Sequence, residues 1–269
     1  MSVYSGFGIM HLLIEGSEAQ IAVGLLAATL VGFSKTGVPG TGILVVPMMA
    51  WVFGGRASVG ALLPMLICAD IFAVLWYRQH CRWDKLMKLI PWVVCGLLAG
   101  GYVLILTGQK PGATDPLNRV IGILVLCMMG LHLLRMKLGD RIKPESSVGV
   151  ALTGAVAGFS TTVSNAAGPV MSIYLTSTGL PKEELVGTQA WYFFIFNLSK
   201  IPIYIVVGML SVGPPMISFD SLRFDAWMIP AIILGAFGGK LFLPHIRQKS
   251  FDVVILSLAT IAAIKLILS

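Results

Sequence analysis

The feature that most constrains the fold of this chain is an eleven-residue stretch that occurs twice. The first copy, at residues 32–42, reads GFSKTGVPGTG, and the second, at residues 158–168, reads GFSTTVSNAAG. Five of the eleven positions are identical, and each copy interrupts an apolar stretch with small, polar and helix-breaking residues. Matching interruptions in the two halves of a membrane protein are typical of a transporter whose binding site lies near mid-membrane. We therefore expect a duplicated chain with a ligand site where the two copies meet.

The composition places nearly all of the chain in a membrane. Of its 269 residues, 57% are hydrophobic and 12% are charged, whereas a soluble domain is about 25% charged. Because a helix crosses the hydrocarbon core with about 20 residues, long apolar runs are candidate membrane helices. Such runs cover residues 59–77, 89–107, 117–134, 185–210, 226–243 and 253–268. The net charge of +7 lies in short loops between these runs and gives no sign of a nucleic-acid partner. No signal peptide is evident.

The duplication predicts an all-α integral membrane protein built from two inverted repeats. The second arm of each interrupted segment, 42–53 or 168–179, has 12 residues. It would extend about 18 Å, which is short of the roughly 30 Å core. Each repeat should therefore contain a broken helix or re-entrant hairpin followed by three transmembrane helices. The first repeat covers residues 1–143, with its hairpin at 17–53 and its spans at 57–77, 88–107 and 117–136. The second repeat covers residues 144–269, with its hairpin at 147–179 and its spans at 184–210, 226–244 and 251–268. Together they would form one transport domain.

Basic residues in the loops predict the orientation, because Lys and Arg are retained on the cytoplasmic side. The loops around residues 78–88, 135–143 and 247–249 are basic and are expected inside, whereas loops 108–116 and 211–225 are expected outside. If each hairpin returns to the side from which it came, both termini of this multi-pass protein lie on the outer, periplasmic side. The same trace makes the two repeats inverted.

The two interruptions supply the residues expected to bind a ligand. Exposed N–H groups and positive helix N-termini at such a break suit an anion. The predicted binding residues are Ser34, Lys35, Thr36, Gly37, Gly40 and Thr41 in the first break, and Ser160, Thr161, Thr162, Ser164 and Asn165 in the second. Lys35 is interpreted as the counter-charge of the anion, although a lysine at a hairpin tip could instead extend to water. The polar side chains of the second break could instead satisfy carbonyls of a broken helix.

Polar residues in the other spans have two interpretations each. Asp70 is an acid at membrane depth, and it could relay protons or pair structurally with Lys200 or Lys240. Gln189 and Trp191 lie near the start of the span that follows the second hairpin and are predicted to face the substrate. Trp191 could equally anchor the protein at the membrane interface.

The chain offers no pattern for catalysis or for a bound cofactor. Its four histidines are dispersed without metal-ligand spacing, and its four cysteines form no CxxC pair. Nucleophile-elbow, P-loop and dinucleotide motifs are absent, so neither an enzyme nor an ATP-driven mechanism is expected. We therefore expect no metal site and no cofactor.

Three features together resemble the TauE/SafE family, also called the sulfite exporter or toluene-sulfonate uptake permease family. They are the duplicated Gly-Phe-Ser-x-Thr break, the Val-Gly opening of the next span at 59–60 and 186–187, and an Arg-x-Asp at 82–84 and 223–225 before a span that contains proline. The resemblance covers about residues 17–268. It implies a secondary carrier in the bacterial or archaeal inner membrane for sulfur-containing anions such as sulfite, sulfoacetate or other sulfonates. The chain departs from the glycine-rich breaks of the family at residues 38–39 and 164–167, and these departures alter the lining of the expected site.

These observations predict a secondary transporter that moves a small anion by alternating access, with export favoured by the resemblance. The expected partners are the anion, the lipid bilayer and a coupling proton or cation, and a homodimer is a further expectation. Two alternatives stay open, namely a passive, channel-like pore for small anions and a carrier for a non-sulfur organic anion.

Overall fold

The computed structural model describes residues 18–37, 41–108, 116–138, 146–211 and 215–242, together with 257, 259–261, 263–265 and 267–268. Throughout these residues the regular structure is helical. Seven helices of this described part are long and apolar enough to cross a membrane. The prediction of an all-α membrane protein is therefore confirmed, whereas the inverted relation of the repeats stays a prediction.

The helices follow one another in the same order in each half of the chain. The first half contains α2 (Glu18–Thr36), η1 (Thr41–Leu44), α3 (Val45–Phe53), α4 (Gly55–Tyr77), η2 (Arg78–His80), α5 (Trp83–Leu106) and α6 (Pro116–Leu138). The second half contains α7 (Ser147–Ser164), α8 (Gly168–Ser177), α9 (Lys182–Leu210) and α10 (Phe219–Phe242). The predicted span at 251–268 lies largely outside the described residues.

The first arm of each hairpin is a long helix that continues into the duplicated stretch. Helix α2 has 19 residues and α7 has 18, so each extends about 27–28 Å and approaches the thickness of the hydrocarbon core. The polar residues of the duplicated stretch therefore lie on the last turns of these helices and not in unwound chain. The physical reason is local, because hydroxyls such as Thr162 Oγ1 donate to the carbonyl one turn earlier, 2.9 Å away, and are satisfied within the helix.

The second arms are short, and both begin inside the bundle. Helix α3 has nine residues and α8 has ten, which corresponds to about 14–15 Å. Helix α7 ends at Ser164, and the C-cap residue Asn165 has a φ of 57°, the left-handed conformation that commonly terminates helices. Helix α8 then starts at Gly168 with Pro169 in its first turn, a position that needs no N–H donor. The second break is thus a sharp interruption of three residues between two helices.

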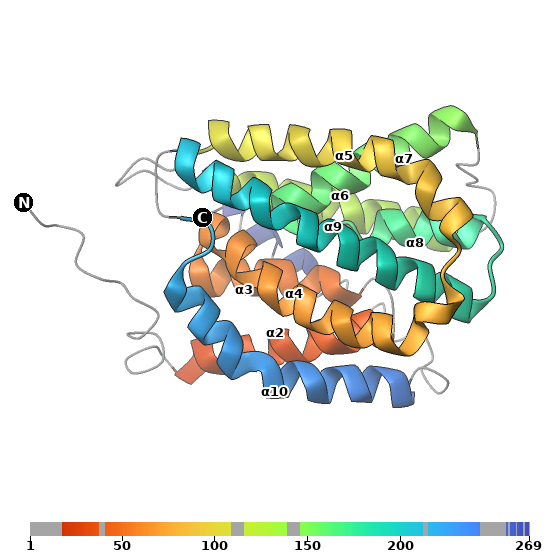
Figure 1. Ribbon diagram of the computed structural model, residues 1–269. Helices are drawn as coiled ribbons and strands as arrows, with labels where there is room; N and C mark the ends of the chain where they lie inside the picture. Colours follow the sequence, from red (N-terminus) through yellow and green to blue (C-terminus); the bar gives the residue numbers. More distant parts are fainter. Residues whose placement is uncertain are drawn as a thin grey trace, which may run out of the picture.

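The two halves pack crosswise. Helix α5 of the first half lies along α7 of the second, and α10 of the second half lies along α2 of the first, with α4 against α9 between them (Figure 1). In chain order α2 corresponds to α7, α4 to α9 and α5 to α10. A two-fold relation between the halves would produce this exchange of partners, and the pattern therefore supports the predicted repeat.

Glycines bring α2 and α10 into backbone contact. A Cβ atom added to Gly32 would lie 2.1 Å from the carbonyl oxygen of Ile232, and one added to Gly235 would lie 2.0 Å from the carbonyl oxygen of Thr29. No side chain fits at such distances, so only glycine permits this approach.

Glycines also bring α5 and α7 into backbone contact. A Cβ atom on Gly158 would lie 2.2 Å from the carbonyl oxygen of Val93, and one on Gly96 would lie 2.2 Å from that of Ala155. Gly158 is the first residue of the second duplicated stretch, as Gly32 is of the first. The glycine that begins each copy of the duplicated stretch therefore serves helix packing in both halves.

Candidate functional site

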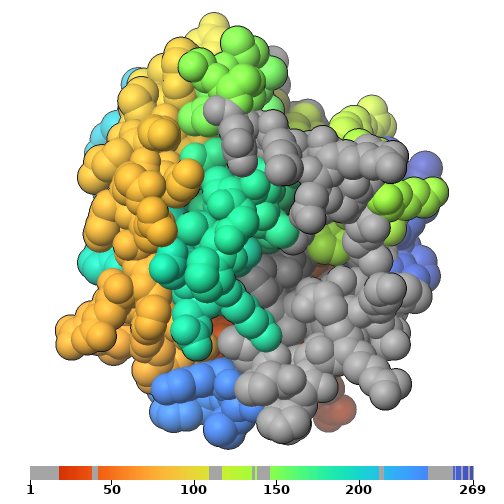
Figure 2. Space-filling view, turned by 90° about the vertical axis from the view of Figure 1, so that its right-hand side faces the viewer, coloured from red at the N-terminus to blue at the C-terminus, as the bar shows by residue number. Residues whose placement is uncertain are grey.

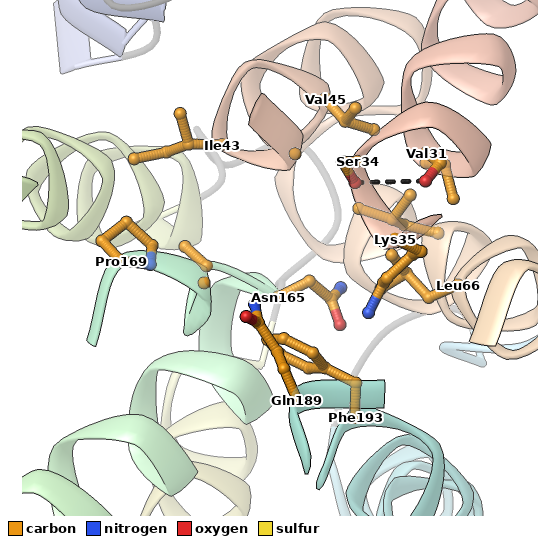
Figure 3. Close-up of a pocket in the computed structure, with 14 residues that line it drawn as sticks. Val31, Ser34, Lys35, Ile43, Val45, Leu66, Asn165, Pro169, Gln189 and Phe193 are labelled. Atoms are coloured by element: carbon orange, nitrogen blue, oxygen red, sulfur yellow. Dashed lines mark hydrogen bonds between the residues drawn. The ribbon is translucent and has the colours of Figure 1, made fainter. Parts of the chain in front are cut away.

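A cavity lies between the two breaks, in the interior of the helix bundle (Figure 3). Its lining comes from α2 (Val31, Ser34, Lys35), from the start of the short arm that contains η1 and α3 (Gly42, Ile43, Val45), from α4 (Leu62, Leu66), from the second break and the start of α8 (Asn165, Ala166, Gly168, Pro169), and from α9 (Gln189, Phe193). A smaller cavity beside it shares several of these residues and extends along α9 to Val186. Residues of both breaks therefore line one cavity, and its role as a ligand site stays a prediction.

Lys35 supplies a positive charge to the cavity wall. It lies in the last turn of α2, where the negative end of the helix dipole favours a cation. Its Nζ lies 2.9 Å from Oδ1 of Asp70 and 3.7 Å from the ring centroid of Phe193. In the close-up view the amine points into the space beside Asn165 and Phe193 (Figure 3). The side chain is 9% exposed, so the predicted alternative, a lysine extending to water, does not describe it.

Asp70 is the partner of Lys35, which corrects the expectation that it would pair with Lys200 or Lys240. The Asp70 side chain is completely buried on α4, and its Oδ2 accepts a hydrogen bond from Nδ2 of Asn197 on α9. The sequence placed Lys35 beyond the end of its helix; because α2 continues to Thr36, Lys35 stays in register to reach α4. Asp70 and Asn197 occupy corresponding spans in the two halves, so this hydrogen bond joins the repeats.

Lys200 holds the second break in place. It is fully buried on α9, and its Nζ donates to the carbonyl and hydroxyl oxygens of Thr161, at 3.1 and 3.2 Å, and to Oδ1 of Asn165. The Asn165 amide in turn donates to the carbonyl of Val59 at 3.0 Å. Each break therefore contacts one buried lysine, with Lys35 on the cavity wall and Lys200 behind it.

Besides Lys35 and Asn165, the polar parts of the cavity wall are Ser34, two helix starts and the amide of Gln189. The first turns of η1 and of α8 border the space at Ile43 and Gly168, and helix N-termini carry partial positive charge. Gln189 contributes a buried Oε1 that accepts no hydrogen bond within the described part of the chain. Two predicted binding elements of this region, Gly40 and the side chain of Thr41, lie outside the described residues.

Two predicted residues of the first break face α10 and not the cavity. The hydroxyl of Thr36 donates to the carbonyl of Ala236 at 2.7 Å. A Cβ atom on Gly37 would lie 2.8 Å from Gly239, so this glycine also serves the α2–α10 contact. Ser34, by contrast, lines the cavity and donates to the carbonyl of Val31.

The predicted hydroxyls of the second break are buried along α7. Thr162 and Ser164 donate to carbonyls one turn earlier, and Thr161 accepts from Lys200. The hydroxyl of Ser160 is buried with no hydrogen-bond partner among the described residues. None of these four lines the cavity. The contacts of Thr162 and Ser164 match the alternative in which hydroxyls satisfy helix carbonyls.

Trp191 and Lys240 lie away from the cavity. The Trp191 ring packs against Trp83 at a centroid distance of 5.2 Å, and its Nε1 donates to the carbonyl of Arg78 at 3.4 Å. Lys240 places its Nζ 4.6 Å from the ring centroid of Trp76. Trp191 therefore closes one end of the bundle, which fits the anchoring interpretation.

The sequence interpretation missed Phe193. It lies one helical turn after Gln189 on α9 and contacts Lys35 through its ring face. Residues four apart share one face of a helix, so the predicted orientation of Gln189 would have indicated Phe193 as well.

Charged residues join α5 and α9 at the end of the bundle shown in Figure 2. Arg82 contacts Asp84 at 3.0 Å and Glu184 at 3.1 Å, and its backbone N–H donates to Thr188 Oγ1. The hydrogen bonds with Asp84 and Glu184 raise the pKa of the Arg82 guanidinium further above its usual range. Burial raises the pKa of the neighbouring Cys81 thiol to about 11, which keeps it protonated at neutral pH. These contacts cover the start of α9 on the predicted cytoplasmic side.

Comparison with known proteins gives one match. A family model described as sulfite exporter TauE/SafE matches residues 22–266, which is nearly the whole chain. The chain matches no curated protein and no solved structure.

Proposed function

The chain belongs to the sulfite exporter TauE/SafE family, a family of membrane transporters, and on that premise we propose that it carries small sulfur-containing anions, such as sulfite and organic sulfonates, through the cavity between the two breaks. The proposal makes the protein a secondary transporter that works by alternating access and, in keeping with the family description, an exporter.

The observation that carries the proposal is the position of Lys35. Its ammonium group stands on the wall of an enclosed cavity, next to two helix starts. An anion there would meet one full positive charge and two partial ones while shielded from water, where such interactions are strongest. The apolar remainder of the wall, including Leu66 and Phe193, suits the small organic group of a sulfonate.

Alternating access is supported by the origin of the lining. Both halves of the chain contribute, with Lys35 from α2 facing Gln189 from α9 across the same space. A movement of one half against the other would change which side of the membrane the cavity reaches. The two crosswise helix pairs, α2 with α10 and α5 with α7, are the natural rigid units for such a movement.

The experiment compares two lysines of the spans. We expect Lys35→Met to weaken the binding of sulfite and methanesulfonate to the purified protein by roughly 10- to 100-fold, because a hydrogen-bonded charge is lost. Lys240→Met removes a lysine that does not line the cavity and should bind as the unaltered protein does. Isothermal titration calorimetry gives both affinities. Equal affinity in the two variants would refute the proposed site.

Transport itself is measured in proteoliposomes. Uptake of labelled sulfite should saturate and should exchange with unlabelled sulfite, sulfoacetate and taurine, and acetate should compete poorly. Efficient competition by acetate would instead favour a carrier for non-sulfur anions. Single-channel currents in a planar bilayer would refute the carrier mechanism in favour of a pore.

A further inference from the structure

In the proposed site the Lys35 ammonium group has two negative neighbours, the Asp70 carboxylate and the bound anion. Lys35 contacts the Asp70 carboxylate at 2.9 Å, and the same side chain lines the cavity. An anion bound at Lys35 would therefore stand within a few ångströms of a carboxylate. Two negative groups that share one positive group disfavour each other, and the carboxylate is the one able to take up a proton.

Burial and a hydrogen bond hold the Asp70 side chain in place, so it cannot move away from such an anion. Its side chain is 0% exposed, and the oxygen not facing Lys35 accepts a hydrogen bond from Asn197. Water cannot screen the repulsion at this depth, so the electrostatic cost is larger than at a surface. Uptake of a proton removes the cost and leaves the carboxyl group in place.

The charges around Asp70 are positive and favour its ionised form, so the negative charge of a bound anion is what makes proton uptake favourable. Among the described residues, the charged groups that act on Asp70 are Lys35 from α2 and Lys200 from α9. Helices α3, α6 and α10 also pack against α4, and their described residues contribute no charge at Asp70. In the pair formed by Lys35 and Asp70 the two charges cancel. Protonation of Asp70 leaves the Lys35 ammonium group with a net charge of +1, which balances a monoanion such as methanesulfonate.

We propose that Asp70 is a proton-binding site coupled to the anion site, so that the protein moves a proton together with its anion. This inference rests on the proposed function. On the side where the anion enters, an O–H bond of a hydronium ion breaks and an O–H bond forms on an Asp70 oxygen. On the side where the anion leaves, the Asp70 O–H bond breaks and the proton binds to a water molecule, which becomes hydronium.

The coupling has a definite sign. Protonation of Asp70 frees Lys35 for the anion, so anion affinity rises as the pH falls. By reciprocity the bound anion strengthens proton binding by the same factor. A pH gradient should therefore drive the anion from the acidic to the alkaline side, and export from a cell with an acidic exterior requires an outward anion gradient that exceeds the opposing pH gradient.

The test counts protons taken up when the anion binds. Methanesulfonate is the probe, because a sulfonate keeps its own charge across the pH range in which proteins are stable. Titration calorimetry in several buffers of different ionisation enthalpy gives the number of protons bound per anion. The unaltered protein should take up a fraction of a proton for each anion bound. That fraction should approach about one at pH values where Asp70 is fully ionised before the anion binds.

Two variants identify the group. Asp70→Asn keeps an oxygen that faces Lys35 and should bind methanesulfonate with no proton uptake and with affinity independent of pH. Asp225→Asn removes another buried carboxylate, on α10 and outside the cavity, and should keep the proton uptake of the unaltered protein. Should Asp70→Asn fail to fold, a lack of proton uptake in the unaltered protein would still overturn the coupling.

Failure of the coupling differs from failure of the proposed function. Binding of methanesulfonate by the unaltered protein without proton uptake would overturn the coupling and leave the anion site intact. Undiminished proton uptake in Asp70→Asn would assign the proton to another group and also overturn it. Absence of any binding of methanesulfonate or sulfite would instead contradict the proposed function.

Discussion

At the scale of single residues, the main feature of the candidate site is the buried ion pair formed by Lys35 and Asp70. Burying either charge alone is expensive, whereas the pair lowers the cost for both. Sequence interpretation identified Lys35 as a binding residue and Asp70 as an acid at depth, but it did not join them. Pairing across helices depends on the rotation of α2 about its axis, and that rotation follows from where the helix ends, which apolar runs do not reveal.

Removal of one charge of the Lys35–Asp70 pair should lower the free energy of unfolding more than removal of both charges. In Lys35→Met the Asp70 carboxylate stays buried without a cation, so we expect the free energy of unfolding to fall by roughly 3–5 kcal/mol. The double variant Lys35→Met/Asp70→Asn has neither charge and should recover most of that loss. Chemical denaturation of the proteins in detergent, followed by circular dichroism, measures the three free energies. A double variant as unstable as the single one would show that the pair does not act as a unit.

At the scale of helices, the duplicated glycines determine how the two halves meet. Gly96 and Gly235 lie at the contacts between the halves. The sequence interpretation did not identify Gly32 and Gly158, which begin the two copies of the duplicated stretch, as members of the same contacts. Single-sequence patterns mark a small residue but do not say which helix approaches it.

One substitution at this contact should loosen the packing of α5 on α7. In Gly158→Ala the new methyl group would overlap the carbonyl oxygen of Val93, which is 2.2 Å from the Cβ position. Backbone must then move, and we expect destabilisation by about 1–3 kcal/mol. Gly130→Ala on α6 is the matched control, because no described atom lies within 4 Å of its Cβ position; it should be neutral or stabilise by up to about 1 kcal/mol. Thermal unfolding of both variants in detergent measures this difference in stability. Equal melting temperatures would argue against the tight contact between α5 and α7.

Helix ends are where sequence and structure differ most. Helix α5 begins at Trp83 and α10 at Phe219, whereas the predicted spans begin at 88 and 226. Polar residues such as Asp84 and Asp220 occupy these first turns, and a search for apolar runs excludes them although a helix can extend beyond the hydrocarbon core.

At the scale of the whole molecule, hydrophobicity was sufficient to predict the class. Apolar runs in a chain with few charges require helices in a membrane, because backbone groups must be satisfied internally, and the family match agrees with the resemblance seen in the duplicated stretch. The orientation of the protein and the inversion of its repeats depend on charge asymmetry in the loops and stay predictions.

Labelling of single cysteines tests the orientation. In a cysteine-free background, Ser147→Cys lies at the exposed start of α7 and should be shielded from a membrane-impermeant maleimide in intact cells, because it faces the cytoplasm. Phe219→Cys at the start of α10, where the native side chain is 80% exposed, should react because it faces outward. Reaction at Ser147→Cys with protection at Phe219→Cys would invert the predicted topology.

The most direct test of the anion site is a structure determined with selenite, the heavier analogue of sulfite, by anomalous diffraction. We predict one strong anomalous peak in the cavity, within hydrogen-bonding distance of Lys35 Nζ and between the first turns of η1 and α8. An empty cavity with the peak elsewhere, for example at the exposed Arg82 end of the bundle, would contradict the central claim that the two breaks together hold the transported anion.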